Sequence, residues 1–239
     1  MENNIFERSE LLLGKNSTTI LSSKKVAIFG LGGVGSYVAE GLARSGIGEF
    51  LLVDNDVVNP TNINRQLIAL HSTIGQQKTL VEKNRILDIN PNAIVNTLEC
   101  FYLPENADQI DLTKFDYVID AIDTVSAKIE LAKRCDELEI PLISAMGTGN
   151  KLSPFNFVVT DIFDTKVCPL AKVMRHELKK RGISHLKVLY SLDEPKIIQS
   201  ETDENGKRLR AVTASVPFVP SVAGLLIASV VVNDLIKGE

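Results

Sequence analysis

A glycine-rich run follows a short apolar stretch early in the chain, with glycines at Gly30, Gly32, Gly33 and Gly35. This G-x-G-x-x-G spacing, between a predicted strand and a predicted helix, allows a tight turn and lets backbone N–H groups approach a phosphate at the positive end of the helix. Asp54 ends the next apolar stretch, where an acidic residue binds ribose hydroxyls. Together these features predict a site for an adenosine nucleotide and leave NAD and ATP both open.

Cationic and amide side chains that follow Asp54 favour ATP over NAD. They are Asn62, Arg65, Gln66 and, at the start of a later helix, Lys78. The pyrophosphate of a dinucleotide needs little positive charge beyond a helix end, whereas cleavage of a triphosphate builds charge that Arg and Lys side chains stabilise. Each of these side chains, taken alone, also fits a solvated surface position. Their grouping above one sheet edge with the glycine motif favours a triphosphate site.

Two carboxylates, Asp120 and Asp123, stand around the end of a predicted strand at residues 117–119. Mg²⁺ prefers oxygen ligands and keeps several of its waters in protein sites. We therefore interpret the two residues as candidate magnesium ligands. A helix N-cap is the alternative interpretation of Asp123.

Short apolar runs alternate with helical periodicity through the first two thirds of the chain, which is typical of a parallel sheet covered by helices. The pattern predicts strands at residues 26–29, 50–53, 94–95, 117–119 and 142–143, and helices at residues 34–45, 76–89 and 125–138. The predicted fold class is α/β, with a mostly parallel Rossmann-like sheet, helices on both faces and a smaller C-terminal extension.

Beyond residue 148 the pattern loosens, and we predict a strand at 155–160, a helix at 170–180 and a mobile charged loop at 193–210. Apolar residues 216–236 close the chain. Prolines near their start and polar residues near their end leave fewer than the roughly 20 residues that a bilayer needs, so a buried helix is favoured over membrane association. We expect one domain over residues 1–239, with a nucleotide-binding core at 1–150 and a substrate and dimer extension at 151–239.

The composition is that of a soluble globular protein, with 239 residues of which 44% are hydrophobic. Lys and Arg number 26 against 30 Asp and Glu, and the net charge of −4 excludes coating of nucleic acid by bulk charge but not by a local basic face. The first ten residues form no basic and apolar leader, so we predict a cytoplasmic protein. The three cysteines form no C-x-x-C pair, and no structural zinc is predicted.

The motifs resemble the adenylation domain shared by ubiquitin-activating enzymes and their bacterial ThiF/MoeB/HesA relatives. The matching stretches are residues 30–35, Asp54 to Asp56, residues 61–66, Lys78 and residues 120–123. The resemblance implies that Asp54 binds the ribose of ATP, and that Mg²⁺ is bound by Asp123. The phosphate ligands that it implies are Asn62, Arg65 and Lys78. It also implies a homodimer, because Arg8 matches the arginine that in this family reaches into the partner subunit's site.

Two departures narrow the resemblance to one branch. The chain lacks the paired C-x-x-C zinc motifs of the sulfur-carrier activators, and Thr124 stands where those enzymes have Asn. Residues 34–36, 42–48 and 168–175 resemble the branch that dehydrates threonylcarbamoyladenosine in tRNA with ATP, which implies a tRNA partner. A sulfur-relay protein is a further candidate partner. Three alternatives stay open: adenylation of a sulfur-carrier protein's C-terminus, an NAD-dependent oxidoreductase, and a binding module without catalysis.

A local basic region supports a tRNA partner independently of the resemblance. Between residues 166 and 187 seven Lys and Arg residues stand against one acid, Glu177, a local charge of +6 in an acidic chain. The candidate nucleic-acid contacts are Lys166, Lys172, Arg175, Lys179, Lys180 and Arg181. Such a patch is typical of a surface that binds a phosphate backbone. Without the resemblance, a solvated helix face explains it equally well.

Cys168 is a candidate nucleophile, because related activators form thioesters. Closing a ring within one substrate needs no covalent enzyme intermediate, so we favour a small buried thiol. The histidines at positions 71, 176 and 185 do not have the spacing of metal ligands.

Overall fold

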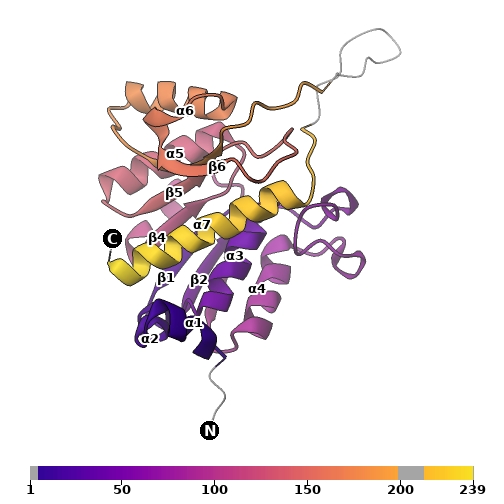
Figure 1. The fold of residues 1–239 in the computed structure, drawn as a ribbon, viewed down its shortest axis with the longest axis vertical. Coiled ribbons are helices and arrows are strands. Elements are labelled where there is room, and N and C mark those ends of the chain that lie inside the picture. The colour runs from indigo at the N-terminus through magenta and orange to yellow at the C-terminus, as the bar shows by residue number, and fades with distance from the viewer. Residues whose placement is uncertain (1–4, 199–212, 239) are drawn as a thin grey trace.

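A seven-stranded sheet runs through the computed structural model, which describes residues 5–198 and 213–238 (Figure 1). The strands are β1 (Lys25–Phe29), β2 (Glu49–Val53), β3 (Ile94–Leu98), β4 (Tyr117–Asp120), β5 (Leu142–Ala145), β6 (Phe157–Asp161) and β7 (Lys187–Ser191). Their order is β3-β2-β1-β4-β5-β7-β6, and the edge strand β6 alone runs antiparallel to its neighbour. The predicted α/β class with a mostly parallel sheet is confirmed.

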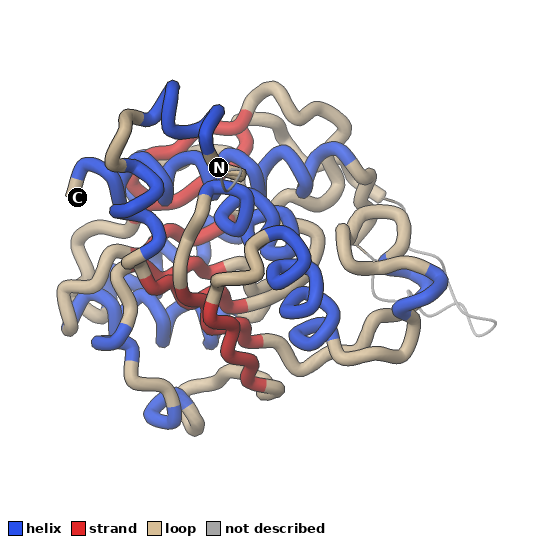
Figure 2. The backbone as a smooth tube through the Cα atoms, turned by 90° about the horizontal axis from the view of Figure 1, so that it is seen from below, coloured by secondary structure: helices blue, strands red, loops and turns tan. Residues whose placement is uncertain are grey.

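Helices cover both faces of this sheet (Figure 2). They are α1 (Glu7–Leu13), α2 (Ser17–Ser22), α3 (Gly35–Ser45), α4 (Lys78–Ile89), α5 (Val125–Glu137), α6 (Pro169–Lys180) and α7 (Phe218–Lys237). Alternate residues of a strand point to opposite faces. Val26 and Ile28 therefore join the core cluster under α3, α4 and α7, whereas Ala27 and Phe29 join the cluster under α5 and α6.

Two strands differ from the sequence-based expectation. β3 is longer than predicted, because Ile94 to Leu98 pair residue by residue with β2. β7 was not predicted, since its apolar run is only three residues long and its burial comes from the neighbouring strands β5 and β6. β6 and β7 complete the same sheet as β1 to β5, so the C-terminal extension shares the sheet of the nucleotide-binding core.

Helix α7 is longer than the sequence analysis predicted. It spans 20 residues and, within the described chain, is the helix long and apolar enough to cross a membrane; 56% of its most apolar window is buried in the protein. The expectation that this apolar segment is too short to span a bilayer was therefore wrong. Its burial against the rest of the protein is what identifies it as a core helix. α7 crosses α3 closely, because a Cβ at Gly224 would lie 2.4 Å from the carbonyl oxygen of Val34, and one at Gly41 would lie 2.6 Å from the Cβ of Ala228.

The predicted charged loop at residues 193–210 falls for the most part outside the described residues. Its described beginning is anchored, since the backbone N–H of Lys196 donates to the carbonyl of Asn150. The segment that resumes at residue 213 is anchored to the same asparagine, whose Oδ1 accepts from the N–H of Ala214.

Glu82 is a fully buried carboxyl group on the inner face of α4, and neither of its oxygens has a hydrogen-bond partner among the described residues. Burial raises its pKa well above the ordinary value of 4.5, and the neighbouring carboxylate of Glu40 raises it further. The guanidinium of Arg85 lowers this pKa, but its effect is the smallest of the three. Its Nε and Nη2 donate to Glu40 at 2.7 and 3.0 Å. Glu82 is therefore held as a neutral acid over a wider pH range than an exposed glutamate.

Glu82→Gln is expected to remove a pH dependence from the free energy of unfolding. Because the pKa of Glu82 is raised in the folded state, the stability linked to its protonation is fully present below the pKa of this residue in the unfolded chain. That stability is lost as the pH rises through the pKa in the folded protein, at about 1.4 kcal/mol for each pH unit between the two pKa values. Urea titrations of both proteins at a series of pH values measure the difference.

The exposed Glu105, changed to glutamine in the same way, is the control. Wild type and Glu82→Gln that lose stability equally toward alkaline pH would show that Glu82 is not a neutral buried acid.

Candidate active site

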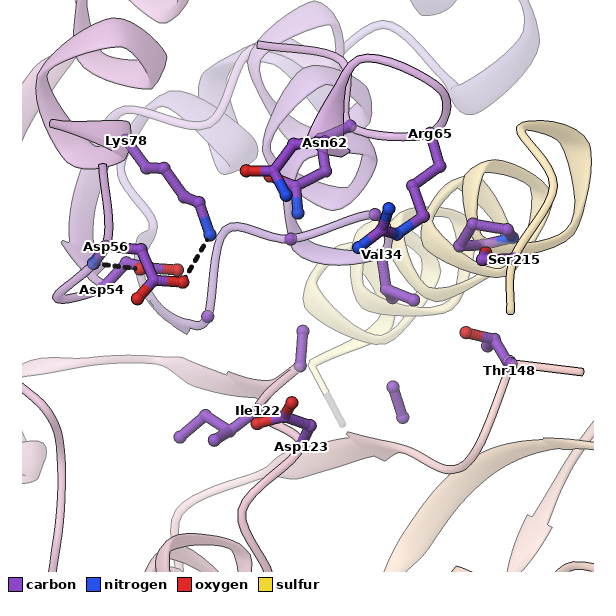
Figure 3. A pocket seen from close by; sticks show the side chains of 18 of the residues that line it. Val34, Asp54, Asp56, Asn62, Arg65, Lys78, Ile122, Asp123, Thr148 and Ser215 are labelled. Carbon is purple, nitrogen blue, oxygen red and sulfur yellow. Dashed lines mark hydrogen bonds and ion pairs between the residues drawn. The ribbon is translucent and has the colours of Figure 1, made fainter. Parts of the chain in front are cut away.

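A cavity of about 660 Å³ opens beyond the carboxyl ends of β1, β2, β4 and β5 (Figure 3). β1 and β4 are neighbours in the sheet, and the chain leaves them in opposite directions, toward β2 on one side and β5 on the other. Such a switch point forms the crevice in which open α/β sheets bind their ligands. Most nucleotide-site residues expected from the sequence line this cavity: Gly30, Gly32, Gly33, Asp54, Asn62, Arg65, Gln66, Lys78 and Asp123.

The glycine run forms a tight loop between β1 and α3. Gly30 has a φ of +88°, and a Cβ there would lie 2.8 Å from the carbonyl oxygen of Ala121, in the turn after β4. A Cβ at Gly35 would lie 1.8 Å from the carbonyl oxygen of Gly30. A Cβ at Gly32 would lie 3.9 Å from its nearest neighbour, Nε2 of Gln66, so space is open on that side of the loop. α3 begins at Gly35, and the positive dipole of its first turn favours an anion in that space. The backbone N–H of Ser36 donates to the carbonyl of Gly32, and those of Tyr37 and Val38 donate to the carbonyl of Val34.

Asp54 joins two loops of the cavity. Its Oδ2 accepts from the backbone N–H of Leu31 at 2.6 Å, and its Oδ1 accepts from the backbone N–H of Asp56 at 2.8 Å. A carboxylate accepts about four hydrogen bonds, so both oxygens retain capacity for ribose hydroxyls. The geometry fits the role that the sequence assigned to this residue.

Lys78 points into the cavity from the first turn of α4 and pairs with Asp56 (Figure 3). The distance from Nζ to Oδ2 is 2.7 Å; the lysine side chain is 4% exposed and the aspartate side chain 57%. The backbone N–H of Lys78 also donates to the carbonyl of Asp56. The cation is thus held at the cavity wall, with a partner that solvent or a phosphate can replace.

The loop before α4 supplies the other phosphate candidates. The guanidinium of Arg65 donates through Nη1 to the carbonyl of Thr61 and to Oδ1 of Asn64, both at 2.9 Å. Asn62 is 9% exposed, and its Oδ1 accepts from the N–H of Asn59. Gln66 is 7% exposed, and its buried Oε1 has no partner among the described residues. A short turn that caps itself therefore presents three donor side chains to the cavity.

Of the two carboxylates proposed as magnesium ligands, only Asp123 faces the cavity. It is exposed, and its one hydrogen bond within the described chain is a 3.4 Å contact from the hydroxyl of Thr124. Thr124, not Asp123, holds the N-cap position of α5, so the N-cap alternative was wrong. Asp123 is thereby left available to a cation.

The prediction that Asp120 binds Mg²⁺ was wrong, because this side chain is fully buried beneath the cavity. Its Oδ2 accepts from Nζ of Lys128 at 2.9 Å and from the hydroxyl of Ser144 at 2.5 Å, and its Oδ1 accepts from the N–H of Ile122. Nζ of Lys128 also donates to Ser144 and to the carbonyl of Ala145. This buried pair ties α5 to the ends of β4 and β5, and so supports two loops that line the cavity.

The cavity carries more negative than positive charge. Among the described residues, its charged lining consists of the carboxylates of Asp54, Asp56 and Asp123 and the cations of Arg65 and Lys78, which leaves −1. Burial raises the pKa of the two other ionisable lining groups, Cys100 and Tyr102, so they stay neutral at neutral pH. On the charges of the described lining, a triphosphate would need further cations at this site.

Two candidates lie away from this cavity. Arg8 is exposed on α1 and does not line the cavity of its own chain. Cys168 is 2% exposed at the N-cap of α6, behind Gly147, which fits the small buried thiol that we favoured.

Fewer basic side chains are available on the patch at residues 166–187 than the seven counted from the sequence. Arg175 donates to the carbonyl of Thr165, and Lys180 and Arg181 pair with Glu177 at 3.0 and 2.8 Å. Hydrogen bonds from Arg181, which contributes most, and from Lys180 lower the pKa of Glu177 to about 2. Lys187 pairs with Asp234 of α7 at 2.8 Å. The exposed lysines that have no such pairing among the described residues are Lys166, Lys172 and Lys179.

Sequence reasoning missed the wall opposite Asp54. Residues 146–149 after β5 and the segment just before α7 meet there and bring Thr148, Thr213 and Ser215 to the cavity. The side chains come from stretches more than sixty residues apart, and no local pattern marks them. Only Gly147 and Gly149, a few residues beyond the strand predicted at 142–143, gave a signal in the sequence.

Comparison with known proteins places the chain among enzymes of one family. A model of the ThiF family matches residues 6–236. The chain is 45% identical over 240 residues to the tRNA threonylcarbamoyladenosine dehydratase of Bacillus subtilis (strain 168), which covers 97% of this chain and 94% of that protein. Crystal structures of the Escherichia coli tRNA N6-threonylcarbamoyladenosine dehydratase with AMP and with ATP match at TM-scores of 0.89 and 0.86 and at 31% and 30% identity. Both matches cover 98% of this chain and 94% of theirs. The chain therefore belongs to the ThiF family.

Proposed function

We propose that this chain dehydrates threonylcarbamoyladenosine in tRNA to its cyclic form, with ATP as the activating substrate, in the cytoplasm. The observation that carries the proposal is the 45% identity to a dehydratase of that name over 97% of the chain. The nucleotide complexes of the E. coli relative support ATP as the activating substrate. Cationic side chains in the cavity favour this activity over hydride transfer to NAD.

ATP is placed by the residues around the switch point. Asp54 binds the ribose hydroxyls, and the loop from Gly30 to Gly35 brings N–H groups to the phosphates. Side-chain donors to the phosphates are Asn62, Arg65, Gln66 and Lys78. On phosphate binding, Lys78 exchanges its contact with the half-exposed Asp56 for one with the ligand.

The negative charge of the cavity supports two further partners. Asp123 is the exposed lining carboxylate that would hold Mg²⁺, which prefers oxygen ligands and keeps several of its waters. Bound there, the ion would offset charge on the triphosphate and on the departing pyrophosphate.

Arg8 of a second copy is the other cation. The helix α1 that carries it exposes Leu11 and Leu12 at 83% and 87%, and α7 exposes Phe218 and Leu225 at 47% each. These apolar faces support a homodimer in which each Arg8 serves the partner's cavity. A sulfur-relay protein remains a candidate accessory partner, for which the cavity offers no support.

The reaction has two steps. A carboxylate oxygen of the threonyl group attacks the α-phosphorus of ATP, and pyrophosphate leaves as the mixed anhydride with AMP forms. The carbamoyl group of the same side chain then attacks the activated carbonyl carbon and gives up a proton, and AMP departs with the former carboxylate oxygen. Arg65 and Lys78 offset the charge that builds on the departing pyrophosphate. Both reacting groups of the second step belong to one nucleoside, so proximity supplies much of its rate.

Pyrophosphate release with three substrates tests this proposal. The wild type should release pyrophosphate with tRNA that carries threonylcarbamoyladenosine, and the nucleoside recovered from that tRNA should have lost one water. Unmodified tRNA and a sulfur-carrier protein should give background release. Release with the sulfur carrier alone would contradict the proposed substrate.

Reversing charge at Lys172 and Lys179 on α6 should weaken tRNA binding and leave ATP affinity unchanged. Leu170, at the start of the same helix, lines the cavity, so a tRNA whose modified base enters the cavity lies within reach of both lysines. Each phosphate contact adds roughly −0.7 to −0.9 to the slope of log affinity against log salt. A salt titration of tRNA binding should therefore give a shallower slope for Lys172→Glu/Lys179→Glu.

Lys25→Glu/Lys114→Glu is the charge-matched control, since both lysines lie near the amino ends of the strands. Equal slopes for both double variants would reduce the patch to a solvated helix face.

Arg8→Ala and Lys78→Ala should each be inactive alone and regain activity when mixed. If Arg8 serves the partner's cavity, a mixed dimer contains one site with both cations. Pyrophosphate release is measured after subunit exchange, which differently tagged chains and co-purification confirm. Proven exchange without recovery would show that Arg8 does not act across a dimer.

A further inference from the structure

The cavity has a charged end and a hydroxyl end. Asp54, Asp56 and Lys78 lie together at one side, and Thr148 and Ser215 face each other at the other (Figure 3). Thr213 joins them in the lining. Nucleotide binding as proposed uses the charged end and the loops in the middle, and leaves the hydroxyl end without a role.

The segment 213–215 is held at the cavity wall by hydrogen bonds at Ala214 and Ser215. Ala214 exchanges two hydrogen bonds with Asn150: its N–H donates to Oδ1 at 2.8 Å, and its carbonyl accepts from the Asn150 N–H at 2.7 Å. The carbonyl of Ser215 accepts from Nδ2 of Asn64 at 3.0 Å. In an extended segment residues i and i+2 point to the same side. Thr213 and Ser215 accordingly line the cavity, whereas Ala214 does not.

Asn64 links this segment to the phosphate loop. Its Oδ1 accepts from Nη1 of Arg65 at 2.9 Å, while its Nδ2 holds Ser215. On the other side, a Cβ at Gly149 would lie 2.2 Å from Cγ2 of Thr213, so glycine is what lets the two walls meet. Asn64 and Asn150 therefore fix the position of the hydroxyl end relative to the guanidinium of Arg65.

The hydroxyls at this end are free to bind a ligand. Among the described residues no hydrogen bond is made by the hydroxyl of Thr148 or Thr213, and Ser215 Oγ has only a 3.5 Å contact with the carbonyl of Val216. Hydroxyls both donate and accept, which suits a small acyl group that carries a carboxylate, a hydroxyl and a carbamoyl.

We infer that Thr148, Thr213 and Ser215 form the subsite for the acyl group, and that they bind the threonylcarbamoyl moiety and present its carboxylate to the α-phosphate. This inference rests on the proposed function. The subsite would discriminate among acyl groups by hydrogen bonds to the threonine hydroxyl and the carbamoyl, independently of the basic patch on α6.

The test compares two tRNA substrates, one with threonylcarbamoyladenosine and one with glycine in place of the threonine. In Thr148→Val, Thr213→Val and Ser215→Ala, each lost hydrogen bond should lower kcat/KM for the threonyl substrate about 3- to 10-fold. The preference for threonyl over glycyl should shrink in at least one variant, a change that a purely structural role would not produce. Affinity for ATP, measured by calorimetry, should stay as in the wild type.

Ser221→Ala is the matched control, because Ser221 lies on α7 outside the cavity and its hydroxyl donates to the carbonyl of Pro217. An unchanged threonyl preference in all three variants would overturn the subsite, as would a loss of ATP affinity, which would assign these hydroxyls to the nucleotide. Failure of the wild type to release pyrophosphate with either tRNA would contradict the proposed function, and the subsite with it.

Discussion

Lys78→Met is expected to lower kcat/KM for pyrophosphate release by about 100- to 1,000-fold, the usual effect of removing one donor to a developing anion. Lys78 is one of two cations in the described part of the cavity lining, and its side chain is 4% exposed. Its removal would take the cavity from −1 to −2 while the triphosphate still has to enter. Little fold stability should be lost, because Asp56 is 57% exposed and solvent can hydrate it once it is unpaired.

Arg65→Ala should have an effect of the same size, since its guanidinium is the other cation. Asp123→Ala should raise the Mg²⁺ concentration needed for half-maximal release. Lys133→Met is the control for charge removal, because Lys133 pairs with Glu137 on the surface of α5. Turnover near that of the wild type, in a variant whose circular dichroism is unchanged, would remove that residue from the mechanism.

The nucleotide end of the site could be predicted from sequence because each of its residues follows a buried strand or begins a helix. Gly30 and Asp54 come directly after β1 and β2, and Asp123 stands three residues beyond the end of β4. Parallel strands bring their carboxyl ends to one edge of the sheet. Lys78 and Arg65 reach that edge from the connection after β2. Local apolar runs therefore determined both the elements and the meeting point of these side chains.

The remainder depends on contacts between distant segments. The hydroxyl end needs Ala214 to pair with Asn150 across 64 positions, and no periodicity records that pairing. β7 is buried by its neighbours, and its own pattern is too short to mark a strand. α1 has no buried residue, so no apolar periodicity marked it either.

Asp120 shows why a residue type alone misled the sequence interpretation. A carboxylate at the end of a strand near a nucleotide motif suits a cation, and here the cation is Lys128. The signal was present in the sequence, because Lys128 shares a helix face with Leu131, Ala132 and Cys135, three, four and seven residues further on. A lysine in that position requires a buried acid, and Asp120 is the acid within its reach.

Lys128→Met is therefore expected to destabilise the fold by about 3–5 kcal/mol, because it leaves Asp120 charged and unpaired in a fully buried site. The double variant Lys128→Met/Asp120→Asn should recover most of that loss. The asparagine side chain of this variant keeps an acceptor for the N–H of Ile122 and offers a neutral amide to Ser144. Urea denaturation of the wild type, both single variants and the double variant gives the coupling energy.

Lys24→Met is the matched control, since its ion pair with Asp116 at 3.2 Å is partly exposed, with side chains 27% and 35% accessible. Such pairs contribute about 0–1 kcal/mol. If Lys128→Met costs no more than Lys24→Met, Asp120 has taken up a proton or water reaches it, and the pair does not hold the loops of the cavity. A large single-variant loss with recovery in the double variant would instead show that the charge pair fixes those loops. Pyrophosphate release by the folded double variant then measures how far catalysis depends on their position.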